Sequence, residues 1–243
     1  MKTITMMMAL LLIAEVSWSA DHAERFLGNN EDQKGMESNP VLEVALYQVK
    51  DNSHENFQEV SAEAHDYLKT FDGYLRSSRY KSILKDRYYL DIVSWESLEQ
   101  AKKAQIRFES DPEVSIFLSS IEDMKFFDHV QSISEDRYHE LMEGDILEFA
   151  SFYIQSGSFE SYVHSRDLLM DHIGTNYDDF KNVHTVRSIK EPELIIDLAH
   201  WGNYESCGVA QKEIESHQLF ADFVVNFDME KEVVMEFFKK IEE

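Results

Sequence analysis

The chain carries the same segment twice, and this duplication limits what it can fold into. Residues 88–110 read YYLDIVSWESLEQAKKAQIRFES, and residues 194–216 read LIIDLAHWGNYESCGVAQKEIES, with no gap between the aligned positions. Asp91 therefore aligns with Asp197 at a spacing of 106 residues. A sequence that repeats itself at domain length predicts two copies of one structural unit in a single chain.

A second echo lies upstream of the first. Residues 41–49 (VLEVALYQV) align with residues 146–154 (ILEFASFYI), which pairs Glu43 with Glu148 at a spacing of 105 residues. The small difference between the two spacings indicates that the copies differ in the lengths of their loops. Loops tolerate such changes better than the elements they connect, so the pattern is that of a structural repeat.

Each copy predicts the same order of elements. Strands are predicted at 41–49, 74–84, 88–95 and 126–133 in the first copy, and at 146–154, 180–190, 194–201 and 232–241 in the second. Helices are predicted at 57–71, from 97 onward with a break at Pro112, at 159–173 and within 204–228. The order βαββαβ is the ferredoxin-like plan.

The duplication also predicts how the copies associate. One such unit covers a single face of its sheet with helices and leaves the other face open. Two copies in one chain close their open faces against each other, which removes an exposed apolar surface. The predicted fold class is therefore α+β: two tandem ferredoxin-like βαββαβ repeats, residues 40–138 and 139–243, form a single-chain pseudo-dimeric α+β barrel. Since the second copy supplies the partner, we expect a monomer.

The N-terminus has the layout of an export signal. Lys2 precedes an apolar run at residues 4–12, and small residues that include Ser19 follow. This order is typical of a secretory signal peptide, so we predict a signal peptide at 1–19 and, because the next stretch is polar and lacks periodicity, a flexible leader at 20–39. The mature protein is expected to cross the inner membrane, to reside in the periplasm and to be soluble, with no membrane insertion after cleavage.

Composition excludes some classes of partner. The chain has 23 basic and 47 acidic residues, a formal net charge of −24. Such a surface repels nucleic acids and anionic membranes, since binding to a phosphate backbone requires cationic contacts. The only cysteine, Cys207, cannot form an intramolecular disulfide, so the hydrophobic core must stabilise the fold.

Alternation along the third strand of each copy separates two faces. Leu90 and Ile92 form an apolar face that we expect to pack on the helices, and we expect the opposite face, with Asp91, to line the barrel. The residues predicted to line the barrel, taken from both copies, are Glu43, Arg76, Tyr80, Asp91, Trp95, Glu148, His184, Asp197 and Trp201. A hairpin closed at Lys85 would place Tyr80 beside Asp91.

The predicted lumen suggests a chemistry. Carboxylates in a semi-enclosed cavity have raised pKa values and act as general acids or bases, so Asp91 and Asp197 are candidate catalytic bases with His184 as a proton shuttle. The other lumen residues would bind the ligand, with the tryptophans forming a wall for a planar molecule. Arg166 lies on the apolar stripe of its helix and must find an anion there, from a ligand or from the protein. The alternative is that the carboxylates pair with nearby cations and form no functional pocket.

The segments IVSWESLEQAKKA, FESDPEVSIFL and IESHQLFADF resemble those of the dimeric α/β-barrel superfamily, and most of all its antibiotic-biosynthesis-monooxygenase-type (ABM-like) domains. The resemblance covers both copies. The superfamily includes monooxygenases, haem-degrading enzymes, dye-decolourising peroxidases and muconolactone isomerases. The resemblance therefore implies the barrel fold and, if the protein is an enzyme, a cofactor-independent oxygenation or a proton-transfer isomerisation.

A haem or metal role is a lesser alternative. None of the ten histidines forms a compact ligand spacing such as HxxxH or HExxH, so no metal site is predicted. His217 begins the segment HQLFADF, a region in which the resemblance would place a haem-ligating histidine. The first copy has Asp111 nearby instead, and no counterparts of the accompanying family residues are evident. We expect no cofactor and keep haem as an alternative.

Two functional interpretations remain open. In the first, the central cavity binds a small apolar or aromatic organic molecule. If the protein also converts that molecule, the carboxylates act as the base. In the second, side chains fill the barrel, which acts as a non-catalytic protein-interaction module. Differences between the copies favour the first, because duplication allows one copy to specialise. These differences are Ser78 against His184, Ser94 against His200 and Ala64 against Arg166.

Overall fold

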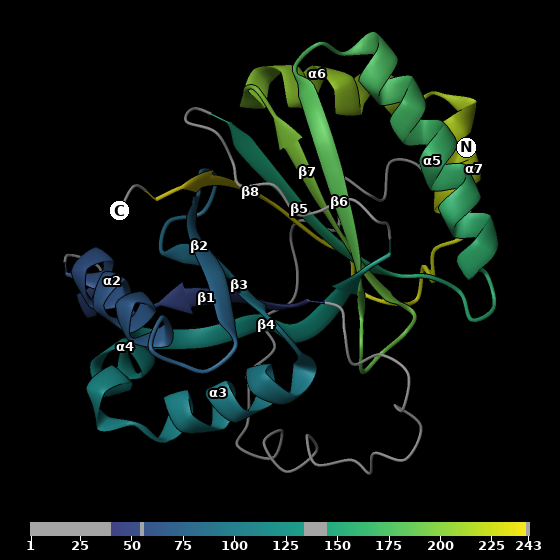
Figure 1. Cartoon of the computed structure of the whole chain (residues 1–243). Helices are drawn as coiled ribbons and strands as arrows, with labels where there is room; N and C mark the ends of the chain where they lie inside the picture. Colours follow the sequence, from purple (N-terminus) through teal and green to yellow (C-terminus); the bar gives the residue numbers. More distant parts are fainter. Residues whose placement is uncertain (1–39, 54–55, 134–144, 242–243) are drawn as a thin grey trace. The chain divides into compact units, whose positions relative to one another are not determined.

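Two βαββαβ repeats build the protein, as the duplication predicts (Figure 1). The computed structural model describes residues 40–53, 56–133 and 145–241. The predicted signal peptide and leader, and the predicted boundary between the repeats at 138 and 139, lie outside the described residues.

The first repeat follows the predicted order. Its elements are β1 (Val41–Val49), the 3-10 helix η3 (Asp51–Ser53), α2 (Phe57–Leu68), β2 (Tyr74–Ser82), β3 (Tyr88–Trp95), α3 (Leu98–Ser110), the 3-10 helix η4 (Pro112–Val114), α4 (Ser115–Ser120) and β4 (Ile121–Ser132). The predicted break at Pro112 is confirmed, since α3 ends at Ser110 and the Asp111 side chain caps the next turn. β4 begins five residues earlier than predicted, at Ile121 instead of residue 126.

The second repeat has the same order. Its elements are β5 (Ile146–Tyr153), α5 (Phe159–Asn176), β6 (Phe180–Ser188), β7 (Leu194–Trp201), α6 (Tyr204–Ile214), α7 (Gln218–Val224) and β8 (Val234–Lys240). Matching polar residues start the helix after the third strand in both repeats. The Ser97 side chain accepts a hydrogen bond from the Gln100 backbone N–H, and the Asn203 side chain accepts one from Ser206.

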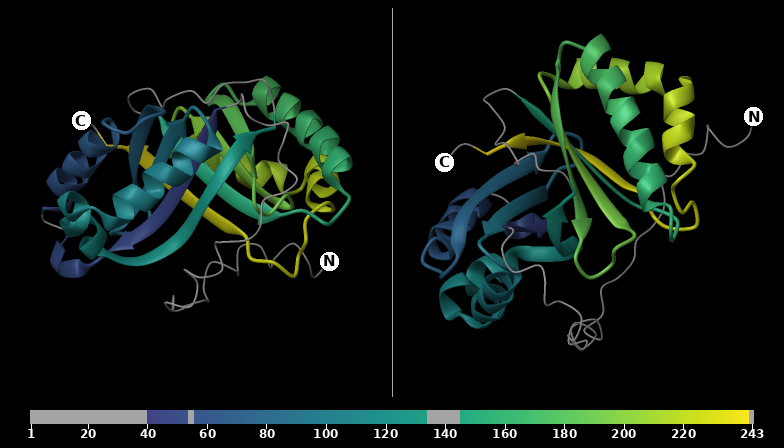
Figure 2. Two further views of the ribbon diagram at one scale, coloured as in Figure 1. Left: turned by 60° about the horizontal axis from the view of Figure 1, so that its bottom comes forward. Right: turned by 45° about the vertical axis from the view of Figure 1, so that its right-hand side comes forward.

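All eight strands close into one antiparallel barrel in the order β1-β3-β2-β8-β5-β7-β6-β4. Each repeat contributes four consecutive positions of this order. Two short ladders join the repeats: β2 pairs with β8, where Lys81 faces Lys239, and β4 pairs with β6, where Gln131 faces Arg187. The helices lie outside the strands, with α2 to α4 beside the first repeat and α5 to α7 beside the second (Figures 1 and 2). No helix among the described residues is long and apolar enough to cross a membrane.

Apolar side chains from every strand fill the interior of the barrel. The buried members of this cluster are Leu42, Val44, Leu46, Tyr80, Leu90, Ile92, Val130, Leu147, Phe149, Val186, Ile196, Leu198 and Phe238. Separate clusters form between the sheet and the helices, and there Trp95 packs with Ala101 of α3, while Trp201 packs with Cys207 of α6. The fold therefore has one core inside the barrel and further cores beneath the helices.

The predicted faces of the third strands are the reverse of the observed ones. Leu90 and Ile92 point into the barrel, and Asp91 and Trp95 point toward the helices. The prediction assumed that polar side chains line a cavity at the centre. The barrel is instead narrow enough for side chains to fill, so its interior takes the uniformly apolar face. The polar residues are accommodated beneath the helices, where helix side chains offer hydrogen-bond partners.

The register of the hairpins also differs from the prediction by one residue. Asp91 faces Arg79 instead of Tyr80, and the aligned Asp197 faces Thr185, the position that matches Arg79. A shift of one residue in an antiparallel ladder moves every side chain to the other face of the sheet. This shift and the reversed faces of β3 are separate errors, and together they leave Tyr80 facing the barrel interior, as predicted.

Candidate functional site

A buried carboxylate lies between the sheet and α2 of the first repeat. Asp91 of β3 has 7% of its surface exposed. Its Oδ2 accepts a hydrogen bond of 2.8 Å from the Tyr47 hydroxyl and lies 3.1 Å from His65 Nε2. Burial, and secondarily the neighbouring Asp91 charge, raises the pKa of Tyr47 well above its ordinary value, so this phenol remains a donor.

The hydrogen bonds continue from His65 toward the surface. His65, 4% exposed, has its Nδ1 3.0 Å from Ser77 Oγ, which lies 2.9 Å from the Tyr74 hydroxyl. A carboxylate oxygen accepts, so neutral His65 carries its proton on Nε2 and accepts from Ser77 at Nδ1. Ser77 and Tyr74 are only partly buried. We call Asp91, His65, Ser77 and Tyr74 the first-repeat relay, since they connect a buried carboxylate with partly exposed hydroxyl groups.

A buried cation accompanies this relay. Arg79 is the direct neighbour of Asp91 in the ladder and has 6% of its surface exposed. Its Nη1 donates to Ser61 Oγ at 3.3 Å and to the Gln58 carbonyl at 3.4 Å, both on α2. The positive charge lies close enough to lower the pKa of Tyr47, against the larger effect of burial. The layer beneath α2 therefore combines a carboxylate, an imidazole and a guanidinium.

The second repeat lacks the relay. Asp197 accepts a hydrogen bond from the Thr185 hydroxyl, and Thr185 Oγ1 accepts one of 2.9 Å from Arg166 Nε. Burial raises the pKa of Asp197, although Thr185 and Arg166 act in the opposite direction. Asp167 occupies the helix position of His65 and forms an ion pair of 2.8 Å with Arg166. Arg166 thus finds its partners within the protein.

The two repeats place their buried cation on different elements. In the first repeat, Arg79 comes from the strand and Ala64 stands on the helix. In the second repeat, Thr185 stands on the strand and Arg166 comes from the helix. A cation remains near the aligned aspartate in both, but only the first arrangement leaves a histidine on that aspartate.

A second pair of predicted residues also lies beneath the helices. Glu148 accepts hydrogen bonds from Trp201 Nε1 at 2.9 Å, Gln211 Nε2 at 2.8 Å and Cys207 Sγ at 3.5 Å. Burial raises the pKa of Glu148 and that of the Cys207 thiol. These donors satisfy the carboxylate, as expected of a structural group.

The matching residues of the first repeat are arranged differently. Glu43 Oε2 lies 3.2 Å from His129 Nε2. The Trp95 indole N–H is fully buried and has no hydrogen-bond partner within the described residues. Within the described residues, the Trp201 indole N–H therefore donates a hydrogen bond and that of Trp95 does not.

Three predicted site residues do face the barrel interior. In the ladders Arg76 pairs with Ser94, Tyr80 with Leu90 and His184 with Leu198. Leu90 and Leu198 belong to the interior cluster, and so does Leu42, which pairs with Ser94 on its other side. The sheet separates these three from the predicted residues on the helix side, which are Glu43, Asp91, Trp95, Glu148, Arg166, Asp197 and Trp201. The prediction that they share one lumen is wrong. Their catalytic and ligand-binding roles stay predictions.

The residues that complete the relay, His65, Ser77 and Tyr74, were not predicted from the sequence. α2 buries Phe57, Ser61, Ala64, His65 and Leu68. The available signal was the pair of polar residues, Ser61 and His65, on an otherwise apolar stripe of the helix. Arg166 on α5 was identified from a signal of this kind. The contribution of Ser77 depends on how α2 packs over β2, which no local pattern reveals.

His217 lies at the surface of the second repeat. Its Nδ1 accepts a hydrogen bond of 3.2 Å from the Leu219 N–H at the start of α7, and its ring stacks on His172 at 4.3 Å between centroids. Within the described residues, no group of three or more histidine, cysteine, aspartate or glutamate side chains is placed to hold a metal ion. Haem ligation by His217 stays a prediction.

No protein-family profile matches the sequence, and no curated protein matches it. Solved structures do share the fold. An anthrone oxidase-like protein has a TM-score of 0.64 at 11% identity, over 85% of this chain and 93% of that one. A monooxygenase-like protein from Fusobacterium nucleatum has a TM-score of 0.59 at 9% identity, over 85% and 94%. A chlorite dismutase variant from Candidatus Nitrospira defluvii has a TM-score of 0.57 at 13% identity, over 84% and 92%. The chain therefore shares its fold with these three solved structures over most of its length.

Proposed function

We propose that the protein binds a small organic molecule between the sheet and the helices of its first repeat and exchanges a proton with it through His65 and Asp91. The observation that carries this proposal is the first-repeat relay, which runs from a buried carboxylate to partly exposed hydroxyl groups. In this proposal His65 is the base in place of the predicted Asp91, Asp91 orients its ring, and the predicted His184 has no part. Residues 1–19 would direct the protein to the periplasm.

The relay suggests a specific order of proton movements. Asp91 accepts the Nε2 proton of His65 in a hydrogen bond, which orients the ring and leaves Nδ1 as the basic nitrogen. A substrate C–H or O–H group next to Ser77 gives its proton to the hydroxyl as Ser77 gives its own to Nδ1. The resulting imidazolium is stabilised by the Asp91 carboxylate. Such proton removal begins an isomerisation and also a cofactor-independent oxygenation, and the monooxygenase-like and anthrone oxidase-like names of proteins with this fold agree with the second.

Proton exchange tests the proposal without knowledge of the final product. Anthrone and a panel of small ketones with acidic C–H groups would be incubated with the protein in D2O, and deuterium incorporation followed by NMR. We expect His65→Gln and Asp91→Asn to slow the catalysed exchange by about 10²-fold to 10⁴-fold, the usual contribution of a general base. Asp197→Asn is the matched control in the second repeat. Equal exchange rates for His65→Gln and the wild type would refute the role of the relay.

The filled barrel supports the second interpretation, a non-catalytic interaction module. Its observation is the interior cluster to which all eight strands contribute. Native mass spectrometry of protein purified from its own host distinguishes the two functions. A reproducible added mass of small-molecule size supports the ligand site. Its absence, together with no catalysed exchange, supports the interaction module.

A further inference from the structure

The guanidinium of Arg79 makes few hydrogen bonds for a buried group. Its guanidinium has five N–H donors, and only Nη1 makes hydrogen bonds within the described residues, to Ser61 and Gln58 at 3.3 Å and 3.4 Å. Both bonds are long and both acceptors are neutral. No carboxylate oxygen of the described residues lies within the 4.0 Å of an ion pair. Asp91 is the ladder neighbour of Arg79, and the Arg79 charge contributes to lowering the pKa of Asp66, so carboxylates lie near the guanidinium. Its remaining N–H donors are open to a further acceptor.

A groove lined by lysines lies beside this guanidinium. Its lining residues are Gln58, Lys81, Ser82, Ile83, Lys239, Lys240 and Ile241, and its volume is about 440 Å³. Gln58 belongs to both places, because its carbonyl accepts the Arg79 hydrogen bond. The groove therefore runs along the junction of the repeats, next to the helix that covers Arg79.

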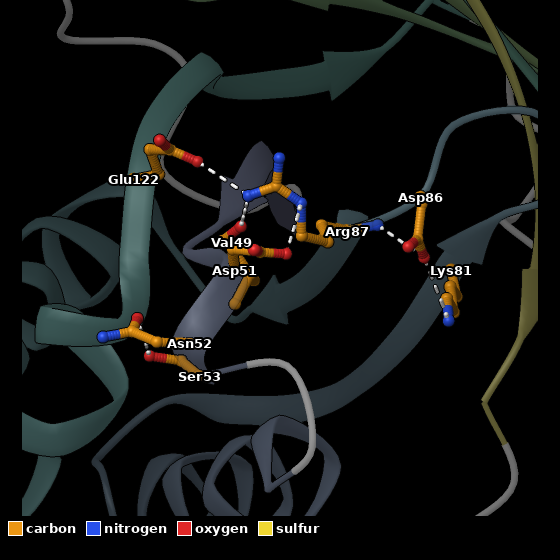
Figure 3. Close-up of polar contacts among 8 residues, drawn as sticks. All are labelled: Val49, Asp51, Asn52, Ser53, Lys81, Asp86, Arg87 and Glu122. Atoms are coloured by element: carbon orange, nitrogen blue, oxygen red, sulfur yellow. Dashed lines mark hydrogen bonds and ion pairs between the residues drawn. The ribbon is translucent and has the colours of Figure 1, made fainter.

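Two of these lysines face each other directly. Lys81 and Lys239 are partners in the β2·β8 ladder, and like charges in this position are destabilising. Among the described residues, Lys81 forms an ion pair with the exposed Asp86, at 3.8 Å (Figure 3). Lys239 makes no ion pair with any described residue. An anion between the two ammonium groups would remove their repulsion.

The equivalent place in the second repeat has no such arrangement. There Thr185 stands in place of Arg79, and the ladder pairs Gln131 with Arg187 in place of two lysines. The Arg187 guanidinium lies 4.1 Å from the centre of the Phe159 ring. Within the described residues, two lysines face each other at only one of the two junctions, in a protein whose net charge is −24.

We propose that Arg79, Lys81 and Lys239 form a binding site for a small organic carboxylate. A guanidinium recognises a carboxylate through two parallel hydrogen bonds, and the lysines add charge at the entrance. Ile83 and Ile241 provide apolar surface for the body of the molecule. Anion binding here requires no proton transfer by the first-repeat relay, so the two proposals can fail separately.

Titration calorimetry at low salt tests the site, with benzoate as the probe and neutral benzamide as its matched control. We expect benzoate to bind, benzamide to bind at least tenfold more weakly, and binding to weaken as salt is added. Lys81→Gln combined with Lys239→Gln should weaken benzoate binding about tenfold or more, the effect of losing charged hydrogen bonds. These lysines are not fully buried, so the double variant avoids the folding risk of changing Arg79.

Two further arms complete the test. Lys103→Gln removes an exposed lysine on α3 and should leave benzoate binding unchanged. A variant that ends at Ile241 removes Glu242 and Glu243, and should bind benzoate at least as well. Equal binding of benzoate and benzamide, equal loss in Lys103→Gln, or binding of inorganic phosphate without benzoate would each overturn the proposal.

Discussion

The hydroxyl of Ser82 donates a 3.0 Å hydrogen bond to Oε1 of Glu236, which joins the second strand of the first repeat to the last strand of the second. Glu236 is 1% exposed, and its Oε2 lies 2.9 Å from Lys85 Nζ. Ser82 Oγ also accepts hydrogen bonds from the backbone N–H groups of Leu84 and Lys85. One side chain thus fixes both the hairpin turn and the junction of the repeats.

The same arrangement recurs at the other junction. Ser188 Oγ accepts hydrogen bonds from the N–H groups of Lys190 and Glu191, and it hydrogen-bonds to Asp128 of β4. Burial raises the pKa of Asp128. Ser82 and Ser188 are aligned positions of the repeat, so the duplication preserved a device that closes the barrel on both sides.

Replacement of Ser82 by alanine should destabilise the whole barrel. The change removes one of the donors to the buried Glu236, which keeps Lys85 and the Phe237 N–H, and it frees two turn N–H groups. This predicts a loss of about 1–3 kcal/mol in the free energy of unfolding. Urea denaturation followed by circular dichroism measures it. Ser119→Ala is the control, because that exposed hydroxyl bonds only to a local carbonyl. Equal losses for the two variants would contradict a role at the junction.

The two aligned tryptophans provide a matched pair of substitutions. Trp201 donates to the buried Glu148, whereas the Trp95 N–H has no partner within the described residues. Phenylalanine removes the indole N–H and similar volume at both positions. Trp201→Phe should therefore cost about 1–3 kcal/mol more than Trp95→Phe in the free energy of unfolding. Chemical denaturation of both variants checks this difference, and equal costs would show that Glu148 does not depend on the bond.

The sequence was sufficient for the order of the elements and for the bounds of some of them, although β4 begins five residues earlier than predicted. The repeated segments locate β1 and β3 at the observed residues, because duplicated apolar runs bounded by turns are local signals. It was insufficient for the direction of Asp91. In a strand buried on both faces, alternation defines two faces without saying which one meets the helices.

Part of the candidate site could be predicted from the sequence for the same reason. Asp91 was identified because the repeat preserves it, whereas His65 and Ser77 belong to elements whose contact arises only when α2 packs on β2. The predicted partner of the aspartate, His184, lies across the sheet in register with Leu198. Tertiary packing, and not residue type, decides which histidine meets the carboxylate.

The buried Asp197 should give the protein a specific pH dependence. Burial raises its pKa in the folded chain above the ordinary 3.8, so between these two values the folded chain holds more protons than the unfolded chain. Stability contributed by this group therefore falls as pH rises through that window, by at most about 1.4 kcal/mol per pH unit. Asp197→Asn cannot titrate, so its stability relative to the wild type should increase over the same window.

Urea denaturation at a series of pH values from 4 upward measures this difference. The exposed Asp178→Asn is the control, and its stability should follow that of the wild type at every pH. A constant difference between Asp197→Asn and the wild type would show that Asp197 titrates alike in the folded and unfolded chains.

The turn between β2 and β3 contains a backbone conformation that favours glycine. Arg87 has a φ of 65°, and its Nη1 donates to the Val49 carbonyl at 3.0 Å and to Glu122 at 2.9 Å (Figure 3). Alanine and glycine both remove these contacts, but only alanine keeps the steric cost of the left-handed region. Arg87→Ala should therefore be less stable than Arg87→Gly by about 1 kcal/mol, measured by thermal and urea denaturation. If alanine proved equal to or better than glycine, the turn would have to adopt another conformation in the variant, and the guanidinium contacts would be what holds Arg87 in the left-handed region.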